Sequence, residues 1–329
     1  MSETKYTVLQ RLRQQIGQVV SSAQLVQETG VSRTAVWKAI GALKKEGYPI
    51  TAIQSGGYRL EADGDVLSSH EIQRRRRGHY LGATAFYRDE VPSTNSALRA
   101  LAGTGDLSDG CLLVAGHQTA GRGRQGRSFY SPASSGLYFS FAICRPLSLQ
   151  ALRFLTMAVA LGTSAGIGAL CGVSPSIKWP NDLLLAGKKC CGILTECSLV
   201  AETGSLDYAV VGVGINVKET AFPPELVSVA TALVGSAGRD ISRSDLLDAV
   251  LTGIEQQLEQ LFQENWAQII QDYRQQMLYR GQQVLLHLPQ GQRVQAQLLD
   301  IAEDGGLLIA REGRQEVLYS GDIFPVGQQ

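Results

Sequence analysis

Near its start the chain carries apolar residues at the three-to-four-residue spacing of amphipathic helices. The helical segments are expected over residues 5–17, about 22–29 and about 33–46. Ser21 or Ser22 can cap the second helix and Ser32 the third, with Gly30 making a tight turn between them. Two short strands around Ser55-Gly56-Gly57 follow. This order of helices, turn and hairpin predicts a winged helix-turn-helix over residues 1–65.

Farther along, the pattern changes twice. Continuous apolar runs, typical of buried strands, cover residues 111–118, 136–143, 191–199 and 208–217. Helical spacing covers residues 94–102, 149–171 and 244–275. After about residue 281, short strands broken by glycines predict a small β-barrel or sheet. We therefore expect a head over residues 1–65, a linker over 66–80, an α/β domain over 81–275 and a C-terminal β domain over 276–329.

One apolar run is long enough to be tested as a membrane span. Residues 154–173 contain no charged side chain, and 20 such residues can cross a bilayer as a helix. The run also contains Gly162-x-x-x-Gly166, a spacing that lets helices pack closely. Polar motifs on both sides of the run are expected to form one site, which a span would divide. We predict a helix buried inside the α/β domain and no membrane segment.

Charge separates the head from the rest of the chain. The 329 residues are 44% hydrophobic and 18% charged, which excludes intrinsic disorder. The formal net charge is zero, yet residues 1–80 carry a balance of +5 and the remainder a balance of −5. Because nucleic-acid binding requires basic side chains on one surface, this asymmetry predicts two separate roles.

The third helix presents polar and basic side chains near its N-terminal end, which in such folds enters the major groove. Together with one arginine of the hairpin, the candidate DNA contacts are Ser32, Arg33, Thr34, Trp37, Lys38 and Arg59. A winged helix that contacts only proteins is the alternative. Four consecutive arginines, residues 74–77, lie in the expected linker and can equally contact DNA or form a solvated face.

Cysteine and histidine do not form a metal-binding pattern. None of the six cysteines belongs to a C-x-x-C pair, and the four histidines lie far apart in sequence. A regularly spaced zinc site is therefore not expected. Free thiols and a polar N-terminus without an apolar signal core favour the reducing cytoplasm.

The most distinctive motif is GRGRQGR at residues 121–127, a glycine loop with three interleaved arginines. It fits G-x-G-x-x-G formally, but a dinucleotide fold needs a helix directly afterwards, and Pro132 disfavours one. Guanidinium groups match phosphate oxygens, so we interpret the segment as a mobile phosphate-binding loop that its ligand orders. An exposed basic loop is the alternative. The sequence contains no Walker motif.

Three further motifs place polar groups near apolar strands or helices. KWPND at residues 178–182, with Lys189 seven residues on, combines a cation for a reacting carboxylate or phosphate with an aspartate for Mg²⁺ or a proton. A salt-bridged turn is the alternative. Ser93-Thr94-Asn95 precede a helix and can cap it or bind a small polar group. GVGIN at residues 212–216 allows a ligand or another backbone to approach a strand closely.

In this order, the motifs resemble those of the biotin–protein ligase family. PSTN, Q-x-x-GRGR-x-GR, KWPND and G-x-G-x-N begin at Pro92, Gln118, Lys178 and Gly212. With the head, the resemblance covers nearly the whole chain and extends to bacterial ligases that also repress the biotin operon. It implies an α+β multidomain fold: a winged helix-turn-helix, a central α/β ligase domain on a mixed sheet of the class II synthetase type, and an SH3-like β-barrel.

The resemblance implies a two-step reaction. Biotin and MgATP give biotinyl-5′-adenylate, and a lysine of the biotin carboxyl carrier protein then attacks it and releases AMP. The implied catalytic residues are Lys189, Arg124 and Asp182, of which Asp182 also lies near Mg²⁺ and, as a hypothesis, helps to deprotonate the incoming lysine. The implied biotin-binding residues are Ser93, Thr94, Asn95, Gln118, Arg122, Gly123, Arg124 and Lys189. The implied ATP- or adenylate-binding residues are Gly121, Arg122, Arg124, Arg127, Phe129, Lys178, Asn181 and Asn216.

Two departures from the family pattern are visible. Phe129 stands where the family often has tryptophan, and it can still pack over adenine with less area. Alanine replaces serine at Ala232 in the stretch that begins at Ala230. Neither change removes a charged group.

The resemblance also implies partners. The adenylate-bound ligase would form a homodimer through its central sheet and bind operator DNA of biotin biosynthesis genes, and the same surface would alternatively dock the carrier protein. Three alternatives stay open: a lipoate–protein ligase, a biotin sensor without ligase activity, and a ligase whose head does not bind DNA.

Overall fold

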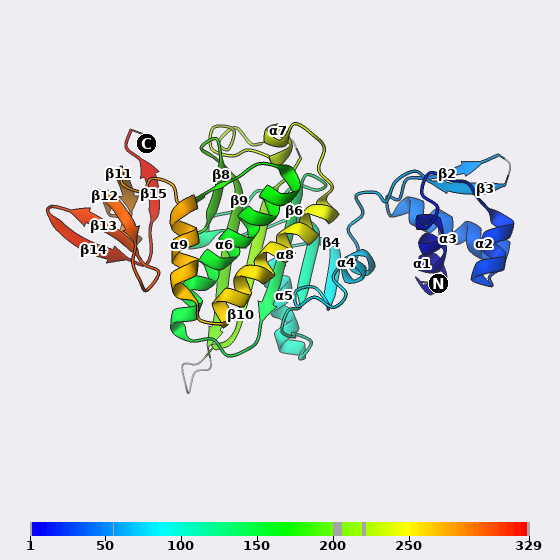
Figure 1. Cartoon of the computed structure of the whole chain (residues 1–329), viewed down its shortest axis with the longest axis horizontal. Coiled ribbons are helices and arrows are strands. Elements are labelled where there is room, and N and C mark those ends of the chain that lie inside the picture. The colour runs from blue at the N-terminus through cyan, green and yellow to red at the C-terminus, as the bar shows by residue number, and fades with distance from the viewer. Residues whose placement is uncertain (1, 55, 200–205, 219–221, 328–329) are drawn as a thin grey trace. The chain divides into compact units, whose positions relative to one another are not determined.

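The computed structural model describes residues 2–54, 56–199, 206–218 and 222–327. It divides into two compact units, Met1–Val66 and Leu67–Gln329, whereas the sequence led us to expect a further boundary near residue 275. Figure 1 labels the elements of both units.

The N-terminal unit has a helix-turn-helix with a β-hairpin. Its elements are α1 (Ser2–Arg13), β1 (Val20–Ser21), α2 (Ser22–Thr29), α3 (Arg33–Lys45), β2 (Ile50–Ile53) and β3 (Gly57–Leu60). The predicted caps are confirmed, because Ser21 Oγ accepts from the N–H of Gln24 and Ser32 Oγ from that of Ala35. Strand β1 was not predicted; it pairs with β3 over only two residues, too few to give a periodic signal. Ser55 of the predicted turn lies outside the described residues.

The second unit is built on a mixed seven-stranded sheet. Along the sheet the strands are β4 (Ala85–Val91), β5 (Leu112–Gln118), β6 (Gly136–Ile143), β10 (Leu206–Asn216), β9 (Lys188–Leu199), β8 (Asp182–Leu185) and β7 (Ser176–Lys178). In this sheet β4 and β5 run parallel, and the other pairings are antiparallel. The four predicted strands are confirmed. We did not predict β4, which is rich in polar residues, or β7 and β8, which flank the KWPND motif.

Helices cover both faces of this sheet (Figure 1). Helices α6 (Leu149–Cys171), α8 (Arg243–Phe262) and α9 (Trp266–Gln276) lie on one face, and α5 (Thr94–Thr104) lies on the other. Alternate strand residues serve the two layers: Val114 and Val211 pack in the core with α6, and Leu113 and Val210 pack with α5. The single helix expected over residues 244–275 is wrong, because Glu264 has a left-handed φ of 57° and separates α8 from α9.

Helix α6 is the apolar run that the sequence raised as a membrane span. Gln150–Cys171 has the length and hydropathy to cross a bilayer, yet 72% of its most apolar window is buried within the structure. Its glycines explain why. A Cβ on Gly162 would lie 2.5 Å from Ile254 Cα, and one on Gly166 would lie 2.5 Å from Val250 Cα. The small residues therefore let α6 and α8 pack backbone to backbone inside this unit.

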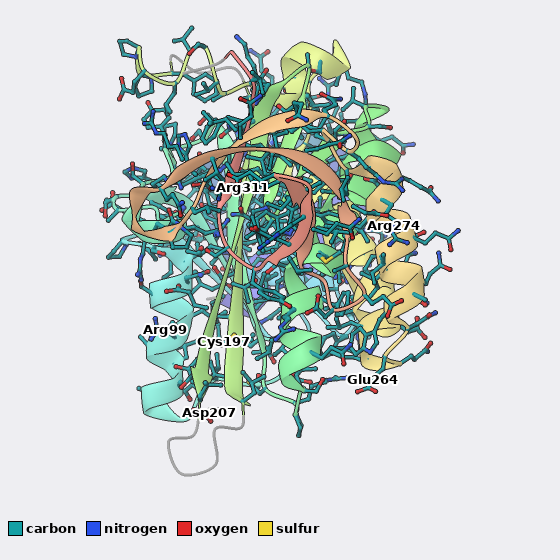
Figure 2. The ribbon with its side chains drawn as sticks, turned by 90° about the vertical axis from the view of Figure 1, so that its left-hand side faces the viewer. Arg99, Cys197, Asp207, Glu264, Arg274 and Arg311 are labelled. Carbon is teal, nitrogen blue, oxygen red and sulfur yellow. The ribbon has the colours of Figure 1, made fainter. Side chains whose placement is uncertain are left out.

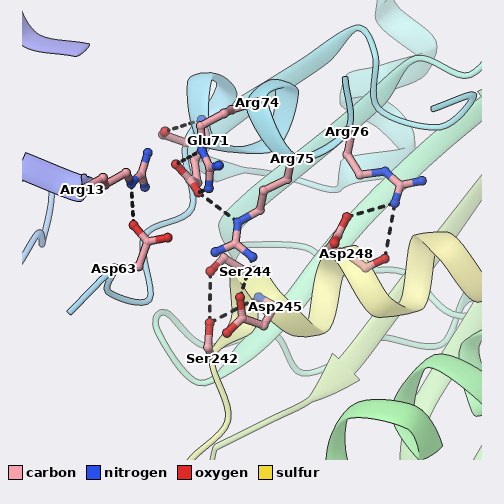
Figure 3. A network of polar contacts seen from close by, with 11 residues as sticks. Arg13, Asp63, Glu71, Arg74, Arg75, Arg76, Ser242, Ser244, Asp245 and Asp248 are labelled. Carbon is pink, nitrogen blue, oxygen red and sulfur yellow. Dashed lines mark hydrogen bonds and ion pairs between the residues drawn. The ribbon is translucent and has the colours of Figure 1, made fainter. Parts of the chain in front are cut away.

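The segment expected as a linker is folded onto the second unit. It contains α4 (Ser69–Arg75), whose buried Glu71 pairs with both Arg74 and Arg75. The next arginine, Arg76, is 1% exposed and bonds to groups of α8 (Figure 3). Arg76 is therefore neither available for DNA contact nor part of a solvated face. That expectation is wrong at this position, because Asp248 and Thr252 of α8, which accept from Arg76, lie 172 and 176 residues away in sequence.

The C-terminal part of the second unit is a five-stranded antiparallel sheet in the order β14-β13-β12-β11-β15. The strands are β11 (Gln283–His287), β12 (Arg293–Ile301), β13 (Leu307–Arg311), β14 (Arg314–Leu318) and β15 (Asp322–Pro325). Its buried Val284 and Leu298 belong to the same core cluster as α6 and the central sheet, which explains why no compact unit begins near residue 275. Closure of this sheet into an SH3-like barrel remains a prediction.

Candidate functional site

The four sequence motifs meet at one cavity above β9 and β10. It is lined by Ser93, Thr94, Asn95, Gln118, Arg122, Gly123, Arg124, Arg127, Ser128, Phe129, Asn181, Asp182, Lys189, Gly192, Ile193, Leu194, Gly212, Val213, Gly214 and Asp322. The cavity volume is about 100 Å³, well below the roughly 300–1,000 Å³ of ordinary ligand pockets. Arg122, Gly123, Arg124 and Arg127 of the arginine loop form part of this lining.

One wall is the buried N-terminus of α5. Gln118 Oε1 accepts from the Thr94 N–H at 2.8 Å, and its amide donates to Ser131 Oγ at 2.8 Å. The Ser140 hydroxyl lies within hydrogen-bond distance of Thr94 Oγ1 (2.7 Å) and Asn95 Oδ1 (2.6 Å). Ser93 stands at the N-cap position, but its side chain makes no capping bond, so capping does not explain this serine. The interlocked polar groups hold this wall in one geometry.

Glycines of β9 and β10 leave space that the side chains of other residues occupy. A Cβ on Gly212 would lie 2.2 Å from Asn95 Oδ1, and one on Gly214 would lie 2.6 Å from the Phe129 ring. The space beside these two glycines is occupied by side chains of this chain, whereas the sequence led us to expect a ligand or another backbone there. The Phe129 ring rests over Gly214 and Gly192 and meets Tyr138 edge-on at 6.5 Å.

A β-bulge directs Lys189 to the site. Leu183 pairs with Cys191, but Leu184 pairs with Lys189, so Cys190 is an extra residue in β9. Strict alternation from Gly192 would place Lys189 on the opposite face of the sheet. With the bulge, Lys189 Nζ lies 2.7 Å from Asp182 Oδ1, and its end lies 3.0 Å from the Cβ position of Gly192. The lysine and aspartate predicted from KWPND form a half-buried ion pair that faces the cavity.

The arginine loop bridges the cavity and the C-terminal sheet. Arg124 donates to Asn181 Oδ1 at 3.3 Å and to Ser320 Oγ and the Gly321 carbonyl at 3.4 Å. Burial lowers the pKa of Arg124, although Asp322 and Asp182 oppose this shift. Arg127 pairs with Asp322. No motif had marked Asp322, because its role depends on a sheet that begins more than 150 residues after the loop.

Three predicted ligand residues lie behind the lining. Lys178 Nζ lies 4.5 Å from the Phe324 ring centre, and burial lowers the pKa of Lys178. Asn216 donates to the Thr231 carbonyl at 3.2 Å and the Lys189 carbonyl at 3.5 Å, so it supports the backbone of the catalytic candidate. A Cβ on Gly121 would lie 2.4 Å from the Phe129 carbonyl oxygen. Their ligand contacts stay a prediction, and in the ligand-free structure these residues contact the chain's own groups.

Comparison with known proteins identifies the family to which this arrangement of residues belongs. Residues 86–216 match the biotin/lipoate A/B protein ligase family, residues 4–59 an HTH domain, and residues 280–324 the biotin protein ligase C-terminal domain. The bifunctional ligase/repressor BirA of Bacillus spizizenii is 33% identical over 306 residues, which cover 92% of this chain and 93% of that protein. The chain belongs to the biotin–protein ligase family. It is a biotin ligase with the organisation of the ligase/repressors.

Two further relatives match most of this chain. A biotin–[acetyl-CoA-carboxylase] ligase of Mycobacterium tuberculosis is 34% identical over 270 residues, covering 79% of this chain and 98% of that protein. The solved structure of biotin protein ligase from Aquifex aeolicus in complex with biotin and ATP has a TM-score of 0.63 and 32% identity, covering 73% of this chain and 97% of that one.

In this biotin ligase, the candidate DNA contacts differ in their availability. Arg33, Thr34 and Lys38 are exposed on α3, and Trp37 is 66% exposed. Ser32 caps α3, where its Oγ accepts from the Ala35 N–H and its O–H can still donate. Arg59 forms an ion pair with Glu61 at 2.9 Å. The exposed basic and aromatic surface therefore lies on the helix rather than on the hairpin.

No cluster of three or more histidine, cysteine, aspartate or glutamate residues occurs in the described part of the chain. Two carboxylates line the cavity: Asp182, which pairs with Lys189, and Asp322, which lies near Arg124 and pairs with Arg127. This donor set suits a metal that arrives with a nucleotide and keeps its phosphate and water ligands.

Proposed function

We propose that the enzyme forms biotinyl-5′-adenylate from biotin and MgATP and then transfers biotin to a lysine of the biotin carboxyl carrier protein. The observation that carries this proposal is the meeting of Lys189, Asp182 and Arg124 with the buried polar wall of α5 in one cavity. The wall offers donors and acceptors for an uncharged polar head group. The cations of Lys189 and Arg124 line the same cavity and would face a reacting carboxylate and phosphate.

The residues suit both half-reactions. In the first, a biotin carboxylate oxygen attacks the α-phosphorus of ATP, and the bond to pyrophosphate breaks. In the second, the lysine amine attacks the anhydride carbonyl, loses a proton, and AMP leaves. Lys189 and Arg124 would stabilise the negative charge on carboxylate and phosphate oxygens. Asp182 would bind the Mg²⁺ of MgATP and later accept the proton of the amine.

Transfer of labelled biotin to a purified carrier domain tests this proposal. We expect labelling that requires both ATP and biotin and that unlabelled lipoate does not suppress. Arg124→Ala should reduce labelling by roughly 10- to 100-fold, because one preorganised cation at a reacting phosphate is lost. A wild-type enzyme that transfers lipoate, or one that binds biotin without transferring it, would contradict the proposal.

We further propose that the head represses biotin biosynthesis genes when the adenylate-bound enzyme dimerises in the cytoplasm. The exposed Arg33, Thr34, Trp37 and Lys38 on α3 support DNA contact. A two-fold dimer would present two such helices to a palindromic operator. The N-terminal match to an HTH domain supports the same role.

Footprinting upstream of biotin biosynthesis genes tests the repressor role. With biotin and ATP present, we expect protection of a palindromic site. Lys38→Ala should weaken this binding. It should also reduce the slope of log K against log salt concentration by about one, the contribution of one phosphate contact. Arg314→Ala, which removes an exposed cation from the C-terminal sheet, is the matched control. Equal binding by both variants would exclude α3 as the contacting surface.

A further inference from the structure

Glu196 joins the rigid wall of the cavity to the arginine loop. It lies on β9 beyond the catalytic lysine, and its carboxylate is 18% exposed. One oxygen, Oε2, accepts from Asn95 Nδ2 at 2.8 Å. The other, Oε1, lies 3.4 Å from NH1 of Arg122 and 3.4 Å from NH1 of Arg99. One carboxylate therefore holds a buried amide and two guanidinium groups.

The contact with Asn95 sets the orientation of the α5 wall. Asn95 is buried, and its amide nitrogen also donates to the Leu194 carbonyl at 3.2 Å. With both hydrogens directed to β9, its Oδ1 atom is turned toward Ser140 at 2.6 Å. Glu196 thus fixes which way the asparagine amide points in the predicted biotin wall.

The two arginines differ in what else they contact. Arg122 belongs to the loop, lines the cavity, is half exposed, and reaches Ser96 Oγ only at 3.5 Å. Arg99 projects from α5 and lines no part of the cavity; Figure 2 shows it beside the strand that carries Cys197. An anion in the cavity can therefore compete with Glu196 for Arg122, whereas Arg99 stays in place as a counter-charge.

We propose that Glu196 is a positioning residue that holds Arg122 aside in the ligand-free ligase and releases it to an anionic ligand. Arg99 makes the release easy, because the carboxylate keeps one cation when Arg122 leaves. The long, half-exposed Arg122 contact is weak enough to exchange. This proposal rests on the proposed function, since the competing anion is the biotinyl adenylate phosphate.

Two single substitutions should change adenylate affinity in opposite directions. The probe is biotinol-5′-AMP, a non-reacting adenylate analogue, measured by titration calorimetry on the full chain. Glu196→Gln keeps an acceptor for Asn95 but removes the competing charge, so the analogue should bind about two- to fivefold more tightly. Arg99→Ala leaves Glu196 dependent on Arg122, so the analogue should bind about two- to fivefold more weakly. In an Arg122→Ala background both effects should disappear.

A neutral ligand, and the comparison of Glu196→Gln with Glu196→Ala, distinguish control of Arg122 from a purely structural role of Glu196. Biotin methyl ester, which carries no anion, should bind Glu196→Gln and wild type alike. Glu196→Ala should weaken the ester by roughly tenfold, because the buried Asn95 amide loses its acceptor. Glu90→Gln, the same change at an exposed glutamate, is the matched control.

Two failures can be told apart. If the wild-type enzyme makes no biotinyl adenylate from biotin and ATP, the proposed function fails. If it makes the adenylate but Glu196→Gln and Arg99→Ala shift analogue affinity in the same direction, or not at all, the role assigned to Glu196 is wrong.

Discussion

Replacing Lys189 with glutamine is expected to lower the rate of adenylate formation by roughly 10²- to 10³-fold, the loss typical of one preorganised charge in an active site. Lys189 Nζ lies 2.7 Å from Asp182 and faces the cavity that Arg124 also lines. Glutamine keeps most of the length of the side chain but cannot neutralise a carboxylate or phosphate oxygen. Pyrophosphate release with saturating biotin and ATP measures the effect.

The neighbouring lysine provides the control. Lys188 is exposed, its Nζ donates to the Val227 carbonyl at 3.0 Å, and it does not line the cavity. Lys188→Gln should retain near-normal adenylation. A Lys189→Gln enzyme with adenylation within a few-fold of wild type would remove Lys189 from the catalytic role.

Asp182→Asn tests whether Asp182 accepts the proton of the attacking lysine during biotin transfer. Once the adenylate is preformed, the second half-reaction should be slowed, because the asparagine cannot accept the proton of the amine. An unchanged rate of single-turnover biotin transfer from preformed adenylate would exclude Asp182 as that acceptor.

Replacing Arg76 with methionine is expected to reduce the free energy of unfolding by about 3–5 kcal/mol, because it breaks a buried charge network and leaves its partners behind. Arg76 lies 3.0 Å from Asp248 (Figure 3). It also lies 2.6 Å from Glu255 and donates to the Leu81 carbonyl at 3.0 Å. Denaturant unfolding of the full chain measures the loss. Arg77→Met, one residue on and exposed, should change stability by less than about 0.5 kcal/mol.

Acid should weaken the same network. Burial raises the pKa of Glu255. Hydrogen bonds from Arg76, the Leu81 N–H and His79 lower it by more than burial raises it, so the pKa lies below its ordinary value of 4.5. The charged carboxylate therefore stabilises the fold above pH 4.5, and this contribution is lost as pH falls through the lowered native value. Arg76→Met should show a smaller loss of stability on acidification. Parallel pH profiles for the variant and wild type would contradict this assignment.

Local chemistry predicted much of the fold. The caps at Ser21 and Ser32, helix α6 and strand β6 have their predicted limits, because each depends on nearby residues and on periodic apolar spacing. The break between α8 and α9 was missed, because helical spacing continues across Glu264 while its backbone turns left-handed. Strand β4 was missed because its polar residues conceal the alternation.

The candidate site divides in the same way. The motifs identified most of the residues that line the cavity, since each motif combines unusual residues within a few positions. They did not identify Asp322, Glu196 or Ser140, whose neighbours carry no distinctive pattern. Lys178 and Asn216 do not line the cavity of the ligand-free structure, and their ligand contacts stay a prediction.

By itself, then, the sequence determined the family, the helix-turn-helix and the chemical groups available for ligation, because these depend on residue type and short spacing. Only the tertiary structure decided which face Lys189 occupies, through the one-residue bulge at Cys190. It also decided that Arg76 is buried and that Arg122 and Arg99 share Glu196. Burial and ion pairing depend on groups that folding brings together from distant parts of the chain. A local sequence pattern does not show which distant groups will meet.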